Sequence, residues 1–439
     1  MGILIGVGAT KPIFPYDYYY GIERDITAAS SACTRIGRPE LHVSLPIQGK
    51  MRRCLLNDNG SVNYYLDGNN SALRDTGSAA VLDGSHGQVM VEIPEYYIKH
   101  EAEGTKIRTL VSEFALPGFR VVPKMYVSAY EATVDRTVPA SIKLASVLNL
   151  TTNFRGGNNT AGWDGSYRTQ LGVPVCNISI SDFRSYARNR GAFGLNNSGW
   201  NCYVYDAHLS LSWLYVVEYA NFNAQLSYNA SPDGNGYKQG GLGEGVTTLV
   251  SATWNTYNSQ CPFVPCGHTN QLGNRTGIVY YTMPAEYGSL TVGVPSYRGV
   301  ENPFGHLWKW TDGVKCRILP DINGGTSEFY VSKSPEKYQT VGYDGYEARG
   351  LLSRESGYIK NIFFGEFGDV LPRETGASSS TYYTDSLSAM SSPESEQKTG
   401  VITCGHSSNG SGAGFLYCNV TYTMSVVDRK IGTRLCFFP

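Results

Sequence analysis

Cys261 and Cys266 form the cysteine pair whose spacing most resembles a metal site. Four residues separate them in CPFVPC, and His268 follows two positions later. Thiolates and imidazole are ligands for a soft metal such as zinc, but a structural zinc site needs four ligands and the sequence offers no fourth nearby. Ordinary loop thiols are therefore the favoured interpretation, with zinc as the alternative.

Other catalytic signatures are missing or lack their context. No G-x-S-x-G turn marks a nucleophilic serine. The glycine-dense stretch GNGYKQGGLGEG lacks the strand-then-helix setting of a dinucleotide-binding loop. Paired carboxylates for sugar hydrolysis cannot be recognised from one sequence. The sequence thus gives no positive indication of an active site.

Charge and hydropathy exclude two classes of partner. The 439 residues carry 36 Lys+Arg against 37 Asp+Glu, a net charge of −1. Nucleic-acid binding needs a clear basic excess, so no nucleic acid is expected. The N-terminal MGILIGVGATKP lacks the basic region and cleavage site of a signal peptide, and no apolar stretch is long enough for a membrane helix, so no membrane insertion is expected. The ten cysteines are predicted to be buried thiols.

Tyrosine and glycine are both abundant. The chain has 32 Tyr and 50 Gly, while charged residues make up only 17%. Tyrosine offers a large, stiff contact area and glycine allows adaptable loops, a composition typical of adhesive surfaces. The alternative is a loop-rich β protein with tyrosines on ordinary strand faces.

The first 120 residues are predicted to be strands and turns. Asn59-Gly60 lies between two strand-like runs and predicts a hairpin. The run GQVMVEIPEYYIKHE alternates and meets Pro94, as an edge strand would, and TKIRTLVSEF is a further strand candidate. Residues 1–20 are interpreted as an arm that docks onto another subunit. The alternative is a strand completing the protein's own sheet.

Two helices are predicted after residue 121. Ser179 and Asp182 resemble a capping box for a short helix that ends at Gly191. A longer helix is predicted within 205–227, with Asp206 as its cap. Short strands and loops follow, and residues 374–400 suggest a surface insertion or mobile loop.

The stretch ENPFGHLWKWTDG holds two of the six tryptophans. In a strand, Trp308 and Trp310 point to the same face as His306, and Leu307 points to the opposite face. Two tryptophans on one face favour a core position, with carbohydrate stacking as the alternative.

Five motifs occur in a recognisable order: MYVSAYEAT, VPVCNISISDFRSYA, VVEYA, NPFGHLWKWTDG and IGTRLCF. This order resembles the formylglycine-generating-enzyme branch of the C-type-lectin fold over about residues 121–439. The resemblance implies a lectin-like domain (121–439) with two helices, long loops and an insertion around 374–400. Together with the N-terminal patterns, it predicts an α+β protein with a docking arm (1–20) and a β-rich N-terminal module (21–120).

The chemistry of that enzyme family is not expected here. The family's oxidase holds copper with a C-x-x-x-x-C pair late in the chain, whereas the cysteines after Trp310 stand at 316, 404, 418 and 436. Cys261 and Cys266 have the spacing but precede the tryptophan motif. The chain is more similar to the non-enzymatic branch, the variable proteins of diversity-generating retroelements and fibre proteins of tailed phages of gut Bacteroides-type hosts. Its N-terminal stretch also resembles the leading module of such phage structural proteins.

In that branch the C-terminal part of the fold presents residues to solvent. The matching region here is about 404–424, where Tyr417, Asn419 and Thr421 alternate with Cys418 and Val420, as on a strand with one outward face. An ordinary solvated strand face is the alternative. The expected ligand-binding surface consists of His406, Ser408, Asn409, Tyr417, Asn419, Thr421 and Tyr422.

The resemblance implies a virion fibre protein, made in the host cytoplasm, that attaches to other virion proteins through its arm. Its lectin-like head would bind a host surface glycan or protein, as a trimer and without a cofactor. Substitution of Tyr417 and Tyr422 is then expected to abolish binding without loss of folding. A purely structural head or tail decoration is the alternative, and an enzyme on the same fold is less favoured. Calcium stays open, with Asp312 and Asp321 as candidate ligands or as ordinary loop acids.

Overall fold

The computed structural model describes residues 15–164, 169–191, 199–248, 262–284, 290–391 and 393–439. This part of the chain is an α+β structure dominated by sheets, as the sequence predicts. Residues 1–14 of the predicted docking arm lie outside the described residues. The end of that arm belongs to the protein's own sheet, because Tyr20 is fully buried within strand β1.

Two sheets make up most of the N-terminal half. A five-stranded sheet has the order β2 (Thr34–Gly37), β1 (Tyr19–Asp25), β7 (Lys106–Ser112), β6 (Tyr96–Glu103) and β8 (Arg120–Val122). A six-stranded sheet has the order β12 (Trp200–Cys202), β25 (Leu435–Phe437), β9 (Met125–Ser128), β5 (Gln88–Ile93), β3 (Arg52–Leu56) and β4 (Val62–Tyr65). The predicted hairpin at Asn59-Gly60 joins β3 to β4, and Gly60 has the positive φ of 82° that its turn requires.

The predicted domain boundary at residue 120 is wrong. Strand β9 pairs with β5 on one side and with the C-terminal β25 on the other, so one sheet contains strands from both predicted units. The side chain of Arg53 crosses the boundary as well, and donates to Gly299 O at 2.7 Å and to Asn270 Oδ1 at 2.6 Å. Sequence patterns predict strands, but they do not predict which strands pair when the strands lie this far apart in the sequence.

The predicted edge strand before Pro94 is also wrong. Strand β5 is buried throughout and lies between β3 and β9, in the interior of the six-stranded sheet. Pro94 terminates this strand and allows the chain to move to β6 in the five-stranded sheet. A proline directly after a central strand removes no ladder hydrogen bond from it.

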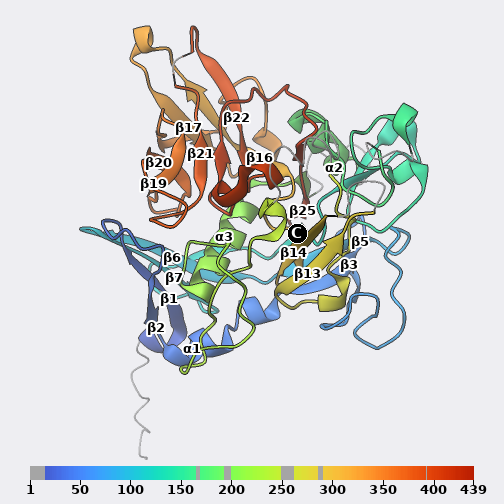
Figure 1. The fold of residues 1–439 in the computed structure, drawn as a ribbon, viewed down its shortest axis with the longest axis horizontal. Coiled ribbons are helices and arrows are strands. Elements are labelled where there is room, and N and C mark those ends of the chain that lie inside the picture. The colour runs from blue at the N-terminus through green and yellow to red at the C-terminus, as the bar shows by residue number, and fades with distance from the viewer. Residues whose placement is uncertain (1–14, 165–168, 192–198, 249–261, 285–289, 392) are drawn as a thin grey trace, which may run out of the picture.

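A nine-stranded sheet forms most of the C-terminal half (Figure 1, orange to red). Its order is β18 (Glu347–Leu351), β17 (Ser327–Val331), β16 (Trp308–Ile318), β22 (Gln397–Thr403), β23 (Cys418–Asn419), β21 (Ser386–Ser388), β19 (Gly357–Phe363) and β20 (Leu371–Thr375), with β24 (Ile431–Gly432) added beside β16. The smaller sheets are β10 (Thr133–Asp135) with β11 (Lys143–Ala145), and β13 (Gly277–Thr282) with β14 (Thr291–Tyr297) and β15 (Val300–Glu301).

Part of the predicted insertion at 374–400 is built into the core. It contributes β21 and the start of β22 to the nine-stranded sheet, and Tyr383 and Asp385 within it are buried. Asp385 accepts a hydrogen bond from the main-chain nitrogen of Leu416 at 2.7 Å, which ties the segment to the approach to β23. Its serine-rich composition reflects turns between short strands.

Three α-helices of the described residues accompany the sheets. Helix α1 covers Pro39–Ser44, α2 Ile180–Arg188 and α3 Tyr205–Tyr219. The predicted cap of α2 is confirmed, since Ser179 accepts from the main-chain nitrogen of Asp182. Asp206, however, does not cap α3: the N-cap is Val204, which makes no side-chain bond, and Asp206 lies in the first turn.

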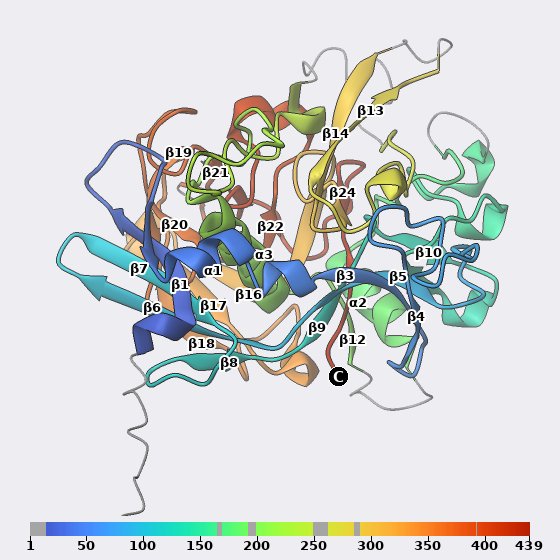
Figure 2. The ribbon, with the colours of Figure 1, turned by 90° about the horizontal axis from the view of Figure 1, so that it is seen from below.

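Helix α3 is the central element. In Figure 1 it lies in green between the nine-stranded sheet and the blue strands of the N-terminal half, and Figure 2 shows it among strands of both halves. Every residue of α3 except Asp206 is buried, which is the pattern of a helix covered on all sides. No described helix has the length and apolarity needed to span a bilayer. The nine described cysteines are free thiols, and eight are buried as predicted.

The shared sheet leads to a prediction about folding. We expect that a fragment of residues 121–439 will not unfold cooperatively, because β9 would lose its partner β5 and expose a buried sheet face. The full chain should give one sharp thermal transition by circular dichroism. A fragment that melts as sharply as the full chain would contradict the shared core.

Candidate functional site

The predicted binding residues converge on Trp308 at the start of β16. The ring of His406 lies perpendicular to the indole at 4.2 Å between centroids, and those of Tyr417 and Tyr422 lie 6.3 Å and 5.8 Å away. The ammonium of Lys430 is 5.4 Å from the indole centroid. We call these five residues the Trp308 cluster.

The predicted outward face of this segment is wrong. Tyr417 and Asn419 are only 1% and 3% exposed, and His406 is buried too. The ring of Tyr417 is covered by the indole of Trp308, whose centroid lies 6.3 Å away, while β22 and β21 pair with the two edges of β23. A strand covered on both faces shows no alternation of buried and exposed residues. Tyr417 and Asn419 are therefore part of the frame.

Four of the seven predicted residues reach the surface. Ser408, Asn409, Thr421 and Tyr422 are half-buried, and we call them the rim. They lie in the turns on either side of β23.

Hydrogen bonds fix both turns of the rim. Asn409 Oδ1 accepts from Trp308 Nε1 and from the main-chain nitrogen of His406, each at 2.8 Å. Neither bond uses the amide nitrogen of Asn409. The main-chain nitrogen of Thr421 donates to Asn419 Oδ1 at 2.9 Å. The rim thus presents amide, hydroxyl and phenol groups on a fixed backbone.

His406 holds the first turn as a neutral ring. Its side chain accepts from the main-chain nitrogen of Ser408, and this bond and that of Asn409 together form a capping box. Burial, and the neighbouring Lys430, lower the pKa of His406 to about 3. The ring therefore carries no charge at neutral pH.

Beneath the cluster, strand β16 carries a buried ion pair. Lys309 Nζ lies 2.9 Å from Glu131 Oε1, and both side chains are almost completely buried. His306 Nδ1 lies 2.6 Å from Glu131 Oε2, while its Nε2 accepts from the main-chain nitrogens of Phe263 and Val264. Because Nε2 accepts, the ring proton is on Nδ1 and is donated to the carboxylate.

The charge state of Glu131 follows from these partners. Burial raises its pKa, but Lys309, His306 and Arg434 outweigh burial and hold the pKa at about 2. A buried carboxylate with one cation and one strong donor stays ionised at neutral pH.

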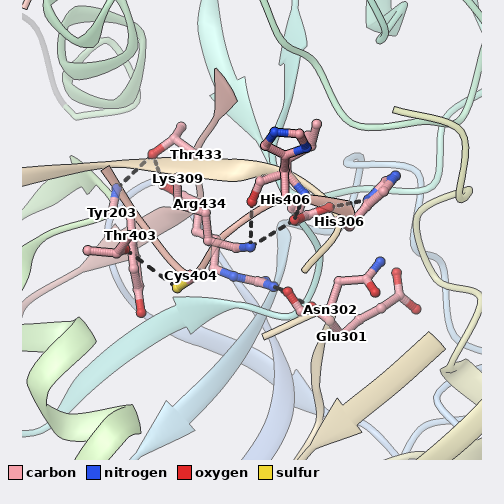
Figure 3. Close-up of polar contacts among 12 residues, drawn as sticks. Tyr203, Glu301, Asn302, His306, Lys309, Thr403, Cys404, His406, Thr433 and Arg434 are labelled. Carbon is pink, nitrogen blue, oxygen red and sulfur yellow. Dashed lines mark hydrogen bonds and ion pairs between the residues drawn. The ribbon is translucent and has the colours of Figure 1, made fainter. Parts of the chain in front are cut away.

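The C-terminal motif completes the frame (Figure 3). Arg434 donates to the main-chain oxygens of Ser128, Asn302 and Glu301, the first two at 3.1 and 2.6 Å. Strand β24 lies parallel to the start of β16. The NPFGHLWKWTDG and IGTRLCF motifs are therefore neighbours in space, and the prediction that Trp308 and Trp310 belong to the core is confirmed.

Each of the two aspartates predicted as calcium ligands accepts hydrogen bonds from an arginine. Asp312 is buried and accepts two bonds from Arg184 of α2, at 2.6 and 2.9 Å. Asp321 accepts from Arg354 at 2.8 Å. Asp312 and Arg184 thus form a buried ion pair between β16 and α2, because the guanidinium binds both oxygens of the carboxylate.

The structure describes only one of the two CPFVPC thiols. Cys261 lies outside the described residues, Cys266 is buried, and His268 Nε2 lies 3.1 Å from Tyr280 O. Within the described ranges, no group of three or more His, Cys, Asp or Glu side chains is placed to hold a metal ion.

Sequence reasoning missed Glu131 and Lys309. The position of Lys309 could have indicated a buried ion pair, because it stands between two tryptophans that were predicted to be core. A lysine within a buried strand needs a carboxylate, and Glu131 lies within the MYVSAYEAT motif. The two residues are 178 positions apart in the sequence, so their pairing could not be predicted from sequence spacing.

The burial of Tyr417 leads to a prediction that corrects the sequence expectation. Tyr417→Ala should lower the free energy of unfolding by about 3–5 kcal/mol, because it leaves a ring-sized void beside Trp308. Tyr422→Ala, at a half-buried position, should cost about 1 kcal/mol. Urea unfolding followed by tryptophan fluorescence would measure both. Tyr417→Phe is the matched control and should lose much less, because it keeps the ring and removes only the hydroxyl, which lies 3.4 Å from Ser388 Oγ. Equal losses at 417 and 422 would contradict the assignment of frame and rim.

The ion pair leads to a second prediction. Glu131→Gln should destabilise the protein by about 3–5 kcal/mol, because the Lys309 ammonium is then buried without a carboxylate. The double variant Glu131→Leu/Lys309→Leu should recover much of that loss, since no buried charge is left. If the double variant lost more stability than the summed losses of Glu131→Leu and Lys309→Leu, the result would count against the ion pair.

The same carboxylate makes a predictable contribution to acid stability. Its folded pKa of about 2 lies below the ordinary value of 4.5, so the stabilisation is complete above about pH 4.5 and is lost as the pH falls towards 2. Glu131→Gln should flatten this limb of the stability curve.

Comparison with protein-family models and with curated protein sequences gives no match to this chain. The arrangement of the rim on its buried frame therefore carries the functional argument.

Proposed function

We propose that this chain is a fibre protein of a tailed-phage virion, with a lectin-like head that binds the host cell surface without catalysing a reaction. The rim is the observation that carries the proposal. Ser408, Asn409, Thr421 and Tyr422 offer polar and aromatic contacts, while the groups beneath them are buried and hydrogen-bonded. Rigid polar surfaces of this kind bind glycans or polar protein surfaces with little loss of conformational entropy.

The resemblance to the formylglycine-generating-enzyme-like fold adds support. The two motifs that carry this resemblance pack against each other through β16 and β24, which is consistent with a common frame. A surface as small as the rim binds weakly, so adhesion gains from several copies. The proposal therefore includes a homotrimer attached to other virion proteins by the N-terminal arm. A head or tail decoration without receptor binding is the competing function.

Binding of the labelled, full-length protein to cells of gut Bacteroides strains, with and without capsular polysaccharide, tests the proposal. We expect the protein to bind some strains and not others, and we expect this binding to be lost when the capsular polysaccharide is removed. Tyr422→Ala combined with Thr421→Ala should reduce binding at least about tenfold, the effect of losing one aromatic contact and one hydrogen bond. The fold should persist, because both side chains are half-buried.

Tyr280→Ala is the matched control. Tyr280 is 71% exposed on β13 and is no part of the Trp308 cluster, so its removal should leave cell binding unchanged. A folded wild-type protein that binds no strain would favour the decoration role. Binding that survives the double substitution would remove the rim from the proposal.

A further inference from the structure

A cavity of about 330 Å³ lies against helix α3, away from the Trp308 cluster. Asp206, Leu209, Ser210 and Trp213 line it at positions i, i+3, i+4 and i+7, so they share one face of the helix. Strands β6 and β8 supply the opposite wall (Figure 2), and the side chains of Tyr338 and Phe438 close it. A volume near 300 Å³ is at the lower end of the range for small-molecule sites.

The floor of this cavity is apolar. It is formed by Ile98, Val122, Met125, Leu209, Trp213 and Tyr338. Its two inner hydroxyls bond to each other, Tyr96 Oη with Ser210 Oγ at 2.9 Å, and Trp213 Nε1 donates outward to Gly368 O at 2.7 Å. Besides the indole nitrogen of Trp213, the hydroxyl of Tyr338 is the one polar side-chain group among these six residues, so the floor favours a largely apolar body.

Three charged residues complete the lining: Arg120, Lys333 and Asp206. Among the described residues none of the three has an ion-pair partner within 4.0 Å. Arg120 donates to Phe367 O at 3.0 Å, and the Lys333 ammonium lies 4.1 Å from the centroid of the Phe367 ring.

The nearby Arg349 makes a useful contrast. Its guanidinium is shared between Asp369 at 3.7 Å and Glu347 at 3.5 Å. Asp369 forms its ion pair with Arg349, although its negative charge also acts on Arg120 and Lys333. Among the charged residues that line the cavity itself, Arg120 and Lys333 outnumber Asp206, so the lining carries a net charge of +1.

We propose that this cavity binds a small apolar carboxylate. The apolar body packs against Leu209 and Trp213, and the carboxylate pairs with Arg120 and Lys333 at the edge of the apolar floor. Asp206 repels the same carboxylate and sets an upper limit on affinity. The site lies on a different part of the molecule from the rim and does not depend on host-cell binding.

Calorimetric titration of the full-length protein with 4-phenylbutyrate tests the charge assignment. The neutral 4-phenylbutanol and the cationic 4-phenylbutylamine have the same apolar body and serve as controls. We expect the carboxylate to bind about tenfold more tightly than the alcohol, the usual gain from a charge-assisted bond, and the amine to bind least. Thermal melts should rise with carboxylate concentration, because ligand binds only the folded state. Absence of carboxylate binding, equal binding of all three, or preference for the amine would overturn the proposal.

Two substitutions locate the binding site. Lys333→Met should weaken 4-phenylbutyrate binding about tenfold without unfolding the protein, because Lys333 is exposed. Lys337→Met is the matched control, an exposed lysine four residues later that does not line the cavity. Asp206→Asn should tighten carboxylate binding and weaken amine binding, because it removes one negative charge. Equal affinities for the variants at 333 and 337, or weaker carboxylate binding by Asp206→Asn, would contradict this site.

Discussion

The buried ion pair between Glu131 and Lys309 is the constraint on which the C-terminal half depends. Two charges removed from water must be matched by close partners, and here the carboxylate holds an ammonium at 2.9 Å and an imidazole nitrogen at 2.6 Å. These contacts join the chain after β9 to the first residues of β16. Trp308 is adjacent to Lys309, so the position of the indole follows from the position of the pair. Arg434 then fixes the terminal strand to the same region through three main-chain oxygens.

Local sequence signals predicted local structure well. The Asn59-Gly60 hairpin and the Ser179 cap of α2 were found because each depends on residues within a few positions of one another. The burial of Trp308 and Trp310 followed from side-chain size alone. The α+β character of the chain could likewise be predicted from its helix and strand patterns.

Apart from the Asp206 cap of α3, the failed predictions share one cause, which is packing between distant segments. Strand β5 is followed by Pro94, as an edge strand would be, but it lies in a sheet interior, because β9 arrives from beyond the predicted boundary. Tyr417 and Asn419 have the alternation of a half-exposed strand but are buried, and the indole of Trp308 from β16 covers Tyr417. The serines of 374–400 suggested a loop, yet the segment supplies β21. In each case the neighbouring strand decides which side chains meet water, and no short stretch of sequence contains that strand.

The distribution of rim and frame has a consequence for the proposed binding role, and it applies only to that role. The frame residues His406 and Tyr417 contact Trp308 in the interior, whereas Ser408, Thr421 and Tyr422 stand in turns at the ends of the buried segment. Side chains in half-exposed turns change with small effects on stability, and buried rings do not. Changes at Ser408, Thr421 and Tyr422 can therefore alter what the surface binds while β16, β22 and β23 keep their positions. Asn409 is the exception, because its side-chain oxygen holds both Trp308 and the main chain of His406. Replacing it changes the frame as well as the surface, so a surface adapted to new ligands would keep Asn409 and vary the other three.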